Sequence, residues 1–274
     1  MLKQRALTAA VLLVFFIAVF FAASESVFQL VMAVVAAAAT YEWATLSGHN
    51  TRVSQIASLV VGFIVLMVNG FLLQSGFVGF TAWVALLFWC YAFHKLRTAP
   101  VLRSIRSADW LSLVIGSCLL IITVACMQNL RFHAPHASSW LLLYCMALVW
   151  VMDTGAYFAG KRFGRNKLAP SISPGKTREG VLGGIAAACS LFLLTALFGS
   201  WPAGALWCVF VASLVAAPFS VAGDLYESRI KRAAGAKDSS DLLPGHGGVL
   251  DRIDGLLATV PMFTAIYLLL VPTG

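Results

Sequence analysis

The chain has 274 residues, of which 60% are hydrophobic and only 11% are charged, and its formal net charge is +8. A soluble domain carries about 25% charged residues, so this composition excludes an ordinary soluble protein. The cations do not form one stripe along a polar face, which argues against a protein that binds nucleic acid.

Apolar segments of about twenty residues recur along the whole chain, and each is long enough to cross a hydrocarbon core of about 30 Å. The short alternating segments of a membrane β-barrel are missing, so we expect an all-α, polytopic integral membrane protein. We treat 1–274 as a single membrane domain, with roughly five spans in 1–138 and the catalytic helices and cytoplasmic loops in 139–274. The pattern predicts nine transmembrane helices, at about 6–23, 27–46, 53–73, 78–94, 110–130, 139–160, 181–200, 203–223 and 253–272.

The distribution of Lys and Arg predicts the orientation. With nine spans, the N-terminus and the loops after the second, fourth, sixth and eighth spans share one side of the membrane. Eighteen of the nineteen Lys and Arg residues fall on that side, and Arg131 alone lies opposite. The positive-inside rule then places the N-terminus and the long polar loops in the cytoplasm and the C-terminus outside. We therefore expect the functional site at the cytoplasmic face.

Two acidic residues lie inside predicted spans. Glu42 is near the end of the second span, where it can reach water, and we expect it to have a structural role. Asp153 lies about 10 Å inside the sixth span, where an unpaired carboxylate costs several kcal/mol. We expect Asp153 to serve function, and the alternative is a pairing with Lys161 or Arg162 at a wet helix end.

The polar loop at 161–180 ends in "SPGKTREG". Its "GKT" resembles the end of a phosphate-binding P-loop, but position 170 is a proline where that motif needs glycine, so we reject a P-loop. Ser173, Lys176, Thr177 and Arg178 precede a helix expected to start near Gly180. A helix N-terminus with neighbouring cations suits phosphate, although a topology signal explains the cations equally well.

The stretch "GDLYESRIKRAAGAKDSSDLLPGHGGVLDRID" at 223–254 holds six acidic residues and five permanent cations. We expect Asp224 to end the eighth span and Asp251 and Asp254 to begin the ninth, so that their carboxylates meet at one cytoplasmic entrance. Carboxylates brought together repel unless a cation lies between them, and Mg²⁺ prefers one or two carboxylates with water and phosphate oxygens. We predict that Asp224 and Asp251 bind Mg²⁺, with Asp254 as a third ligand or as the residue that orients Arg252.

The same stretch offers groups for an anionic substrate. Its Lys and Arg residues can take phosphate charge, and Gly247 and Gly248 let backbone N–H groups approach an anion closely. We expect His246 to be a contact or turn residue, because an attacking phosphate is already an anion and needs no general base. The combination predicts phosphoryl or nucleotidyl transfer, with a solvated charged hairpin as the alternative.

The stretch resembles the signature of the phosphatidate cytidylyltransferases, or CDP-diacylglycerol synthases. The segments "GDLYES" and "DTGAYFAGKRFG" also look like this family, and the strong resemblance covers 150–254. One segment departs, because the family's usual "SPKKTWEG" has Gly175 in place of a lysine here and Arg178 in place of an aromatic residue. The residues that match the signature are Ser228, Ile230, Lys231, Arg232, Lys237, Asp238, Pro244, His246, Gly247, Gly248, Val249, Asp251, Arg252, Ile253 and Asp254.

The resemblance implies an enzyme of phospholipid biosynthesis that converts phosphatidate and CTP into CDP-diacylglycerol and pyrophosphate. It also implies Mg²⁺, with a second cation left open, and a homodimer in the inner membrane of a bacterium, among membrane lipids and without nucleic acid. Together with the charge pattern, it makes Asp224, Lys237, Asp238, Asp251 and Arg252 catalytic candidates. The candidates for contact with substrate or phosphate are Asp153, Ser173, Lys176, Thr177, Ser228, Lys231, Arg232, His246, Gly247 and Gly248.

Two other kinds of protein remain as alternatives. The first is another CTP-dependent lipid enzyme, similar to a CDP-archaeol synthase or a polyprenol kinase. The second is a transporter with Asp153 as an ion site. A transporter is expected to have broken helices at corresponding places in both halves of the chain, whereas the polar residues here are concentrated in cytoplasmic loops of the C-terminal half.

Overall fold

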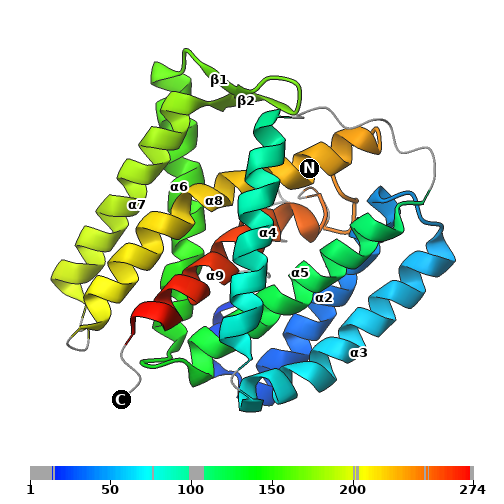
Figure 1. Ribbon diagram of the computed structural model, residues 1–274, viewed down its shortest axis with the longest axis horizontal. Coiled ribbons are helices and arrows are strands. Elements are labelled where there is room, and N and C mark those ends of the chain that lie inside the picture. The colour runs from blue at the N-terminus through cyan, green and yellow to red at the C-terminus, as the bar shows by residue number, and fades with distance from the viewer. Residues whose placement is uncertain are drawn as a thin grey trace.

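The computed structural model describes residues 14, 16–75, 77–98, 108–199, 201, 204–243, 245 and 247–271, which form a bundle of helices with one small hairpin (Figure 1). η1 and η2 are single π-helical turns, and the two strands pair only with each other. In chain order the elements are η1 (Ala18–Ala22), α2 (Glu25–Leu46), α3 (Thr51–Ser75), α4 (Val78–Thr98), α5 (Trp110–Gln128), η2 (Asn129–His133), α6 (Ser139–Phe163), β1 (Lys167–Ala169), β2 (Ser173–Thr177), α7 (Arg178–Phe198), α8 (Ala205–Ala233) and α9 (Leu250–Leu270).

The expected all-α membrane architecture is confirmed. Six helical segments of the described residues are long and apolar enough to cross a bilayer: α2, α5 with η2, α6, α7, α8 and α9. Helices α3 and α4 occupy the third and fourth predicted spans, and α3 contains a shorter apolar stretch at Thr51–Met67. Half of the first predicted span, 6–23, lies outside the described residues, so the number of nine spans is not confirmed.

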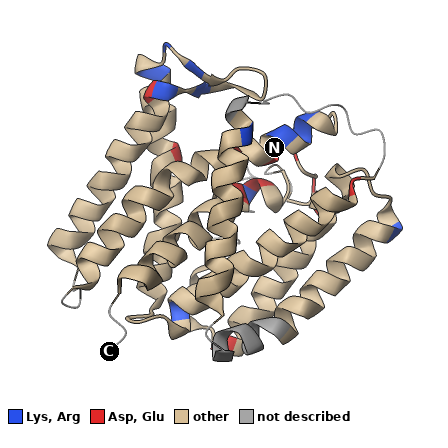
Figure 2. Cartoon of the chain, in the orientation of Figure 1, with Lys and Arg blue, Asp and Glu red and all other residues tan. Residues whose placement is uncertain are grey.

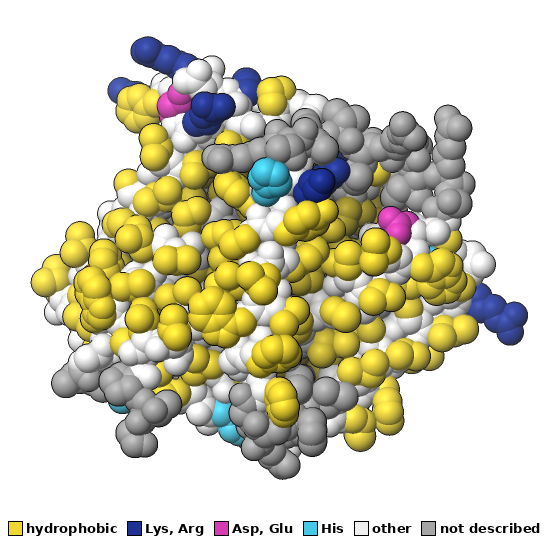
Figure 3. All heavy atoms as spheres, viewed as in Figure 1, with side chains coloured by type: hydrophobic (Ala, Val, Ile, Leu, Met, Phe, Trp, Pro, Cys, Tyr) yellow, Lys and Arg dark blue, Asp and Glu magenta, His cyan; other side chains and the backbone are white. Residues whose placement is uncertain are grey.

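The surface of the bundle fits a lipid environment. Hydrophobic side chains cover the middle of the face in Figure 3, and large ones such as Leu59, Leu87 and Leu197 are 66–76% exposed. Lys and Arg lie mainly along the end of the molecule that carries β1 and β2, as Figure 2 shows. This separation is expected for helices that keep apolar side chains in the bilayer and place their cations at one interface.

Helices α6 and α7 pack closely because small residues face each other. A Cβ atom added at Gly183 would lie 2.1 Å from the Cβ of Ala159, and one added at Gly155 would lie 2.6 Å from the Cβ of Ala187. Such contacts let two membrane helices approach without side chains between them. Beyond the ends of these helices, residues 167–177 form the antiparallel hairpin β1–β2, which the sequence interpretation treated as an irregular loop.

Helix α8 is longer than predicted. The prediction that Asp224 ends this helix is wrong, because α8 continues through the charged residues to Ala233. Lys231 pairs with Glu227 one turn earlier, at 2.6 Å, and cations in the last turn favour the negative end of the helix dipole. The apolar run ends near Gly223, and the ion pair of Lys231 with Glu227 stabilises the helix beyond it.

Arg131, the one cation predicted on the far side, is buried and holds η1 in place. Its guanidinium donates to the carbonyl oxygens of Val19 and Ala23 at 3.0 and 2.9 Å. The rings of Phe28 and Phe132 lie 4.4 and 4.6 Å from the guanidinium carbon, within range of cation–π attraction. The position of Arg131 is therefore explained by contacts within the protein.

Candidate active site

A polar cavity of about 600 Å³ lies between α6, α7, α8 and the hairpin β1–β2. The residues that line it include three lysines and two aspartates. A cavity of this size can hold a nucleotide-sized ligand, and the cations are suited to a polyanion. Its charged lining residues are Asp153, Lys161, Lys167, Lys176 and Asp224.

Asp224, on α8, carries the central contacts of this cavity. Lys176 Nζ lies 2.5 Å from Asp224 Oδ2, and the Ser228 hydroxyl donates to Asp224 Oδ1 at 3.1 Å. The contact brings the hairpin against α8, so residues 48 positions apart in the sequence meet. Three predicted site residues, Lys176, Asp224 and Ser228, are therefore brought together.

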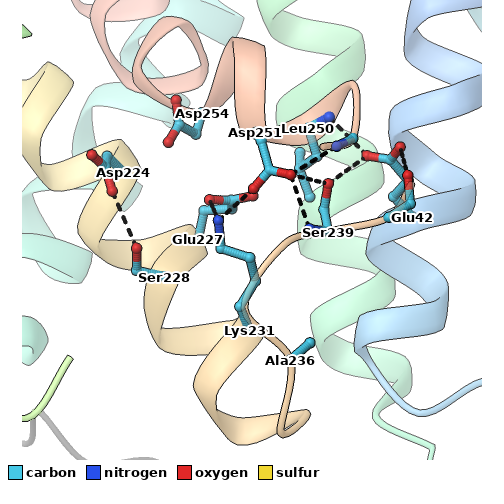
Figure 4. A network of polar contacts seen from close by, with 12 residues as sticks. Glu42, Asp224, Glu227, Ser228, Lys231, Ala236, Ser239, Leu250, Asp251 and Asp254 are labelled. Atoms are coloured by element: carbon cyan, nitrogen blue, oxygen red, sulfur yellow. Dashed lines mark hydrogen bonds and ion pairs between the residues drawn. The ribbon is translucent and has the colours of Figure 1, made fainter. Parts of the chain in front are cut away.

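Asp153 and Asp254 complete the group of carboxylates. Asp153 interacts electrostatically with Asp224 and Lys176, and Asp254 has the same two neighbours. Asp254 lies on the Asp224 side of α9 in Figure 4, with Gly255 N–H donating to its Oδ1 at 2.7 Å. Three carboxylates are therefore neighbours of Lys176, and carboxylate oxygens are ligands that a divalent cation prefers.

The close approach of α8 and α9 fixes this group. A Cβ atom added at Gly223 would lie 2.3 Å from the carbonyl oxygen of Asp254, so only glycine permits this contact. In the part of the chain that the structure describes, no three His, Cys, Asp or Glu side chains converge closely enough to enclose a metal ion. A cation held here would take most of its ligands from water and phosphate oxygens, which is typical of Mg²⁺.

Asp251 lies on α9 three residues before Asp254 and takes part in a separate network of hydrogen bonds (Figure 4). Lys231 Nζ lies 2.5 Å from Asp251 Oδ1, while Ser239 N–H, the Ser239 hydroxyl and Gly248 N–H all donate to Asp251 Oδ2 at 2.9 Å. Both oxygens of Asp251 are therefore engaged by the protein. The structure brings Asp254 toward Asp224, whereas Asp251 pairs with Lys231.

Glu42, on α2, continues this network and is only 1% exposed. It accepts a hydrogen bond from the Ser240 hydroxyl at 2.6 Å, and it lies 2.8 Å from the Ser239 hydroxyl, whose one proton it shares with Asp251. It also accepts from the N–H groups of Val249 and Leu250 at 3.0 and 2.8 Å, where α9 begins. A carboxylate at this place caps the N-terminus of α9 and interacts favourably with the positive end of the helix dipole. The expectation that Glu42 reaches water is wrong, because its carboxylate is buried against Ser239, Ser240, Val249 and Leu250.

The glycines of the "GHGG" segment fit this network. A Cβ atom added at Gly248 would lie 2.0 Å from the Ser239 hydroxyl, and Gly247 has a φ of +76°. The anion that Gly248 N–H approaches is the carboxylate of Asp251, where the sequence interpretation expected a phosphate. His246, which was predicted to contact substrate, lies outside the described residues.

The other predicted residues divide between the cavity and the surface. Ser173 and Thr177 line the cavity, and the Thr177 hydroxyl caps α7 by accepting from Gly180 N–H at 3.1 Å. Lys237 and Asp238 are exposed and do not line the cavity. Arg232 donates to the carbonyl oxygen of Ala236 at 2.9 Å, and Arg252 lines a different, apolar cavity.

Sequence reasoning missed two cavity lysines, Lys161 and Lys167, and the aromatic residue Tyr157. Spacing was an available signal for two of them, because Asp153, Tyr157 and Lys161 follow one another at intervals of four residues. On a helix this spacing places them along one face. Lys167 joins them through the hairpin, whose pairing of Lys167 with Thr177 was not predicted.

Comparison with known proteins identifies a family that matches almost the whole chain. The model of the cytidylyltransferase family matches residues 3–270. The chain is 40% identical over 266 residues to a phosphatidate cytidylyltransferase of Pseudomonas aeruginosa, covering 97% of each chain. It is 37% identical to the Haemophilus influenzae protein of the same name, covering 97% of this chain and 99% of that one, and 36% identical to the Brucella suis protein, covering 86% and 82%. The chain therefore belongs to the cytidylyltransferase family.

Proposed function

We propose that the protein transfers the cytidylyl group of CTP to phosphatidate, forming CDP-diacylglycerol and pyrophosphate in phospholipid biosynthesis. The observation that carries the proposal is the polar cavity in which Lys161, Lys167 and Lys176 lie near the carboxylates of Asp153 and Asp224. The membership of the family and the names of the relatives agree with this chemistry.

In the proposed reaction, a phosphate oxygen of phosphatidate attacks the α-phosphorus of CTP, and the bond from that phosphorus to the bridging oxygen of the β-phosphate breaks. The nucleophile is already an anion, so no residue has to remove a proton from it. The three cavity lysines and the N-terminus of α7 would balance the negative charge of the nucleotide and of the departing pyrophosphate. Ser173 and Thr177, at the same end of α7, are positioned to contact phosphate oxygens.

The carboxylates fit a divalent cation, which we propose is Mg²⁺ held by Asp224 and Asp254. Lys176 on Asp224 marks a position where positive charge is already stabilised. When bound, Mg²⁺ would supply charge neutralisation at the α-phosphate and the pyrophosphate. Both oxygens of Asp224 are also engaged, so Mg²⁺ would take the place of Lys176 there, and Asp251 would become a ligand only if Lys231 released it. In this arrangement the role of Asp251 is to orient Ser239 and Gly248.

We further propose that the cavity and the N-terminus face the cytoplasm of a bacterial inner membrane, where soluble CTP meets a membrane lipid. The excess of Lys and Arg at the end of the bundle with β1 and β2 supports this orientation. The homodimer that the resemblance implies, and a second cation in the site, are part of the same proposal.

Lys176 and Arg178 lie two residues apart, but they face different surroundings. Lys176 is in contact with Asp224 in the cavity, whereas Arg178 is exposed and does not line it. We expect Lys176→Ala to lower kcat/KM for CTP by about tenfold to a hundredfold, because a charge-assisted contact to phosphate is lost. Arg178→Ala serves as the matched control and should stay within about threefold of the wild type. Equal, near-wild-type kinetics for both variants would show that this loop serves topology alone.

The reaction class is tested with purified protein, phosphatidate, Mg²⁺ and CTP labelled at the α-phosphate. Cytidylyl transfer places the label in the organic phase and releases pyrophosphate. A lipid kinase would leave the α-label in CDP in the aqueous phase, and a transporter would convert neither substrate. Label that stays in the aqueous phase would overturn the proposed function.

A further inference from the structure

A second cavity, of about 390 Å³, lies between η1, α2, α5 and α9 and differs from the first in its chemistry. Its walls are aromatic and aliphatic, with Phe20, Phe28, Met127 and Leu257 among the lining residues. Arg252 is the one charged residue among the described residues that line it. It is therefore an apolar space with a single cation, inside a membrane protein.

The apolar cavity extends between the two ends of the bundle. Leu243, Val249 and Arg252 lie where α9 begins, at the same end of the bundle as the Glu42 network. Phe28 and Met127 lie at the opposite end, since α2 begins at Glu25 and α5 ends at Gln128. The apolar space thus runs from the end of the bundle where α9 begins toward the end where α2 begins.

Helix α9 separates this space from the polar cavity. Asp254 is on the side of α9 that packs against Gly223 of α8. Arg252, two residues earlier, lies nearly opposite on the helix at about 100° per residue, and it lines the apolar space. A phosphate held by Arg252 would therefore not lie beside Asp224.

We propose that the apolar cavity is a binding site for a non-reacting anionic phospholipid, with an acyl chain between η1, α2, α5 and α9 and the headgroup phosphate at Arg252. An amphiphile matches both parts of the site, because its chain replaces water at apolar walls and its phosphate meets a guanidinium at the interface. Basic positions between membrane helices on the cytoplasmic side are suited to anionic headgroups. This lipid site is distinct from the site proposed for the reaction.

The test uses the full-length protein in nanodiscs that contain a trace of phosphatidylglycerol with a diazirine at the end of one acyl chain. After irradiation without CTP, mass spectrometry should find the label on the cavity residues of α2 and α5, such as Met32 and Met127. Val35→Trp places a bulky ring in the cavity and should lower this label about tenfold. Val34→Trp is the matched control, because Val34 is the next residue on α2 and is 63% exposed, and it should leave the label unchanged.

A second experiment tests whether Arg252 binds the phosphate of the headgroup. Arg252→Gln should reduce labelling by the phosphatidylglycerol probe several-fold more than labelling by a phosphatidylcholine probe, because only the former depends on net negative charge. Label confined to exposed helix faces, or unchanged in Val35→Trp, would show ordinary bilayer contact and overturn the proposal. Competition by unlabelled phosphatidate but not by phosphatidylglycerol would make the cavity a substrate site and overturn the claim of a non-reacting lipid. Because no arm measures catalysis, these outcomes are independent of the proposed reaction.

Discussion

Replacing Asp224 by asparagine is expected to lower the rate of CDP-diacylglycerol formation at least about a hundredfold while leaving the protein folded. Asparagine keeps the shape of the side chain but removes the charge that faces Lys176 and lies near Asp153 and Asp254. The loss of one carboxylate from a site that stabilises phosphate transfer costs several kcal/mol of transition-state stabilisation. The measurement is initial rate against Mg²⁺ concentration, with size-exclusion chromatography in detergent to confirm folded protein.

The control is Asp241→Asn, which removes an exposed carboxylate from the same charged segment and should be close to wild type. Asp254→Asn and Asp251→Asn show which of these two carboxylates binds Mg²⁺ together with Asp224. We expect Asp254→Asn to shift the Mg²⁺ dependence, whereas Asp251→Asn should lower activity with little change in that dependence, because it disturbs Lys231 and Ser239. A folded Asp224→Asn variant within a few-fold of wild type at limiting Mg²⁺ would remove Asp224 from the reaction.

Replacing Glu42 by alanine is expected to destabilise the protein by about 2–4 kcal/mol and to reduce activity with it. The carboxylate is the acceptor for Ser239, Ser240 and the first N–H groups of α9, and alanine leaves these buried donors without it. Glu42→Gln retains one acceptor oxygen and should lie between alanine and the wild type. Thermal unfolding in detergent measures the stability, and activity is measured well below the midpoint.

Glu25→Ala is the matched control on the same helix. Glu25 pairs with His133 at 2.6 Å, but the side chains are 45% and 35% exposed, so its loss should change the midpoint little. If Glu42→Ala unfolded at the wild-type temperature, the contacts of α2 with the start of α9 would not stabilise the fold. If it were stable but inactive, Glu42 would act mainly by positioning Ser239, Ser240 and the start of α9.

Features that depend on residues close together in the sequence could be predicted. Helix positions follow from long apolar runs, and the eight spans from 27–46 onward each coincide with a helix of the structure. For the cations of the 161–180 loop, phosphate contact and a topology signal were equal alternatives, and Lys176 lines the cavity in contact with Asp224. Asp153, expected to be functional because of its depth in a span, lines the same cavity.

Features that depend on how helices pack could not be predicted. Asp251 and Asp254 are only three residues apart, and which of them faces Asp224 depends on the rotation of α9 against α8 at Gly223. Glu42 and Ser239 are 197 residues apart, and no local pattern joins them. The charged end of α8 was expected to be a loop because the apolar run of the sequence ends at Gly223. In the structure the helix continues, and the ion pair of Glu227 with Lys231 stabilises it.

The proposed mechanism requires that the carboxylates of the polar cavity hold a divalent cation. Electron paramagnetic resonance of free Mn²⁺, titrated into purified protein without lipid substrate, tests it most directly. We predict saturable Mn²⁺ binding to the wild type and to Asp241→Asn, and an affinity at least about tenfold weaker in Asp224→Asn. Unchanged Mn²⁺ affinity in a folded Asp224→Asn variant would contradict the claim.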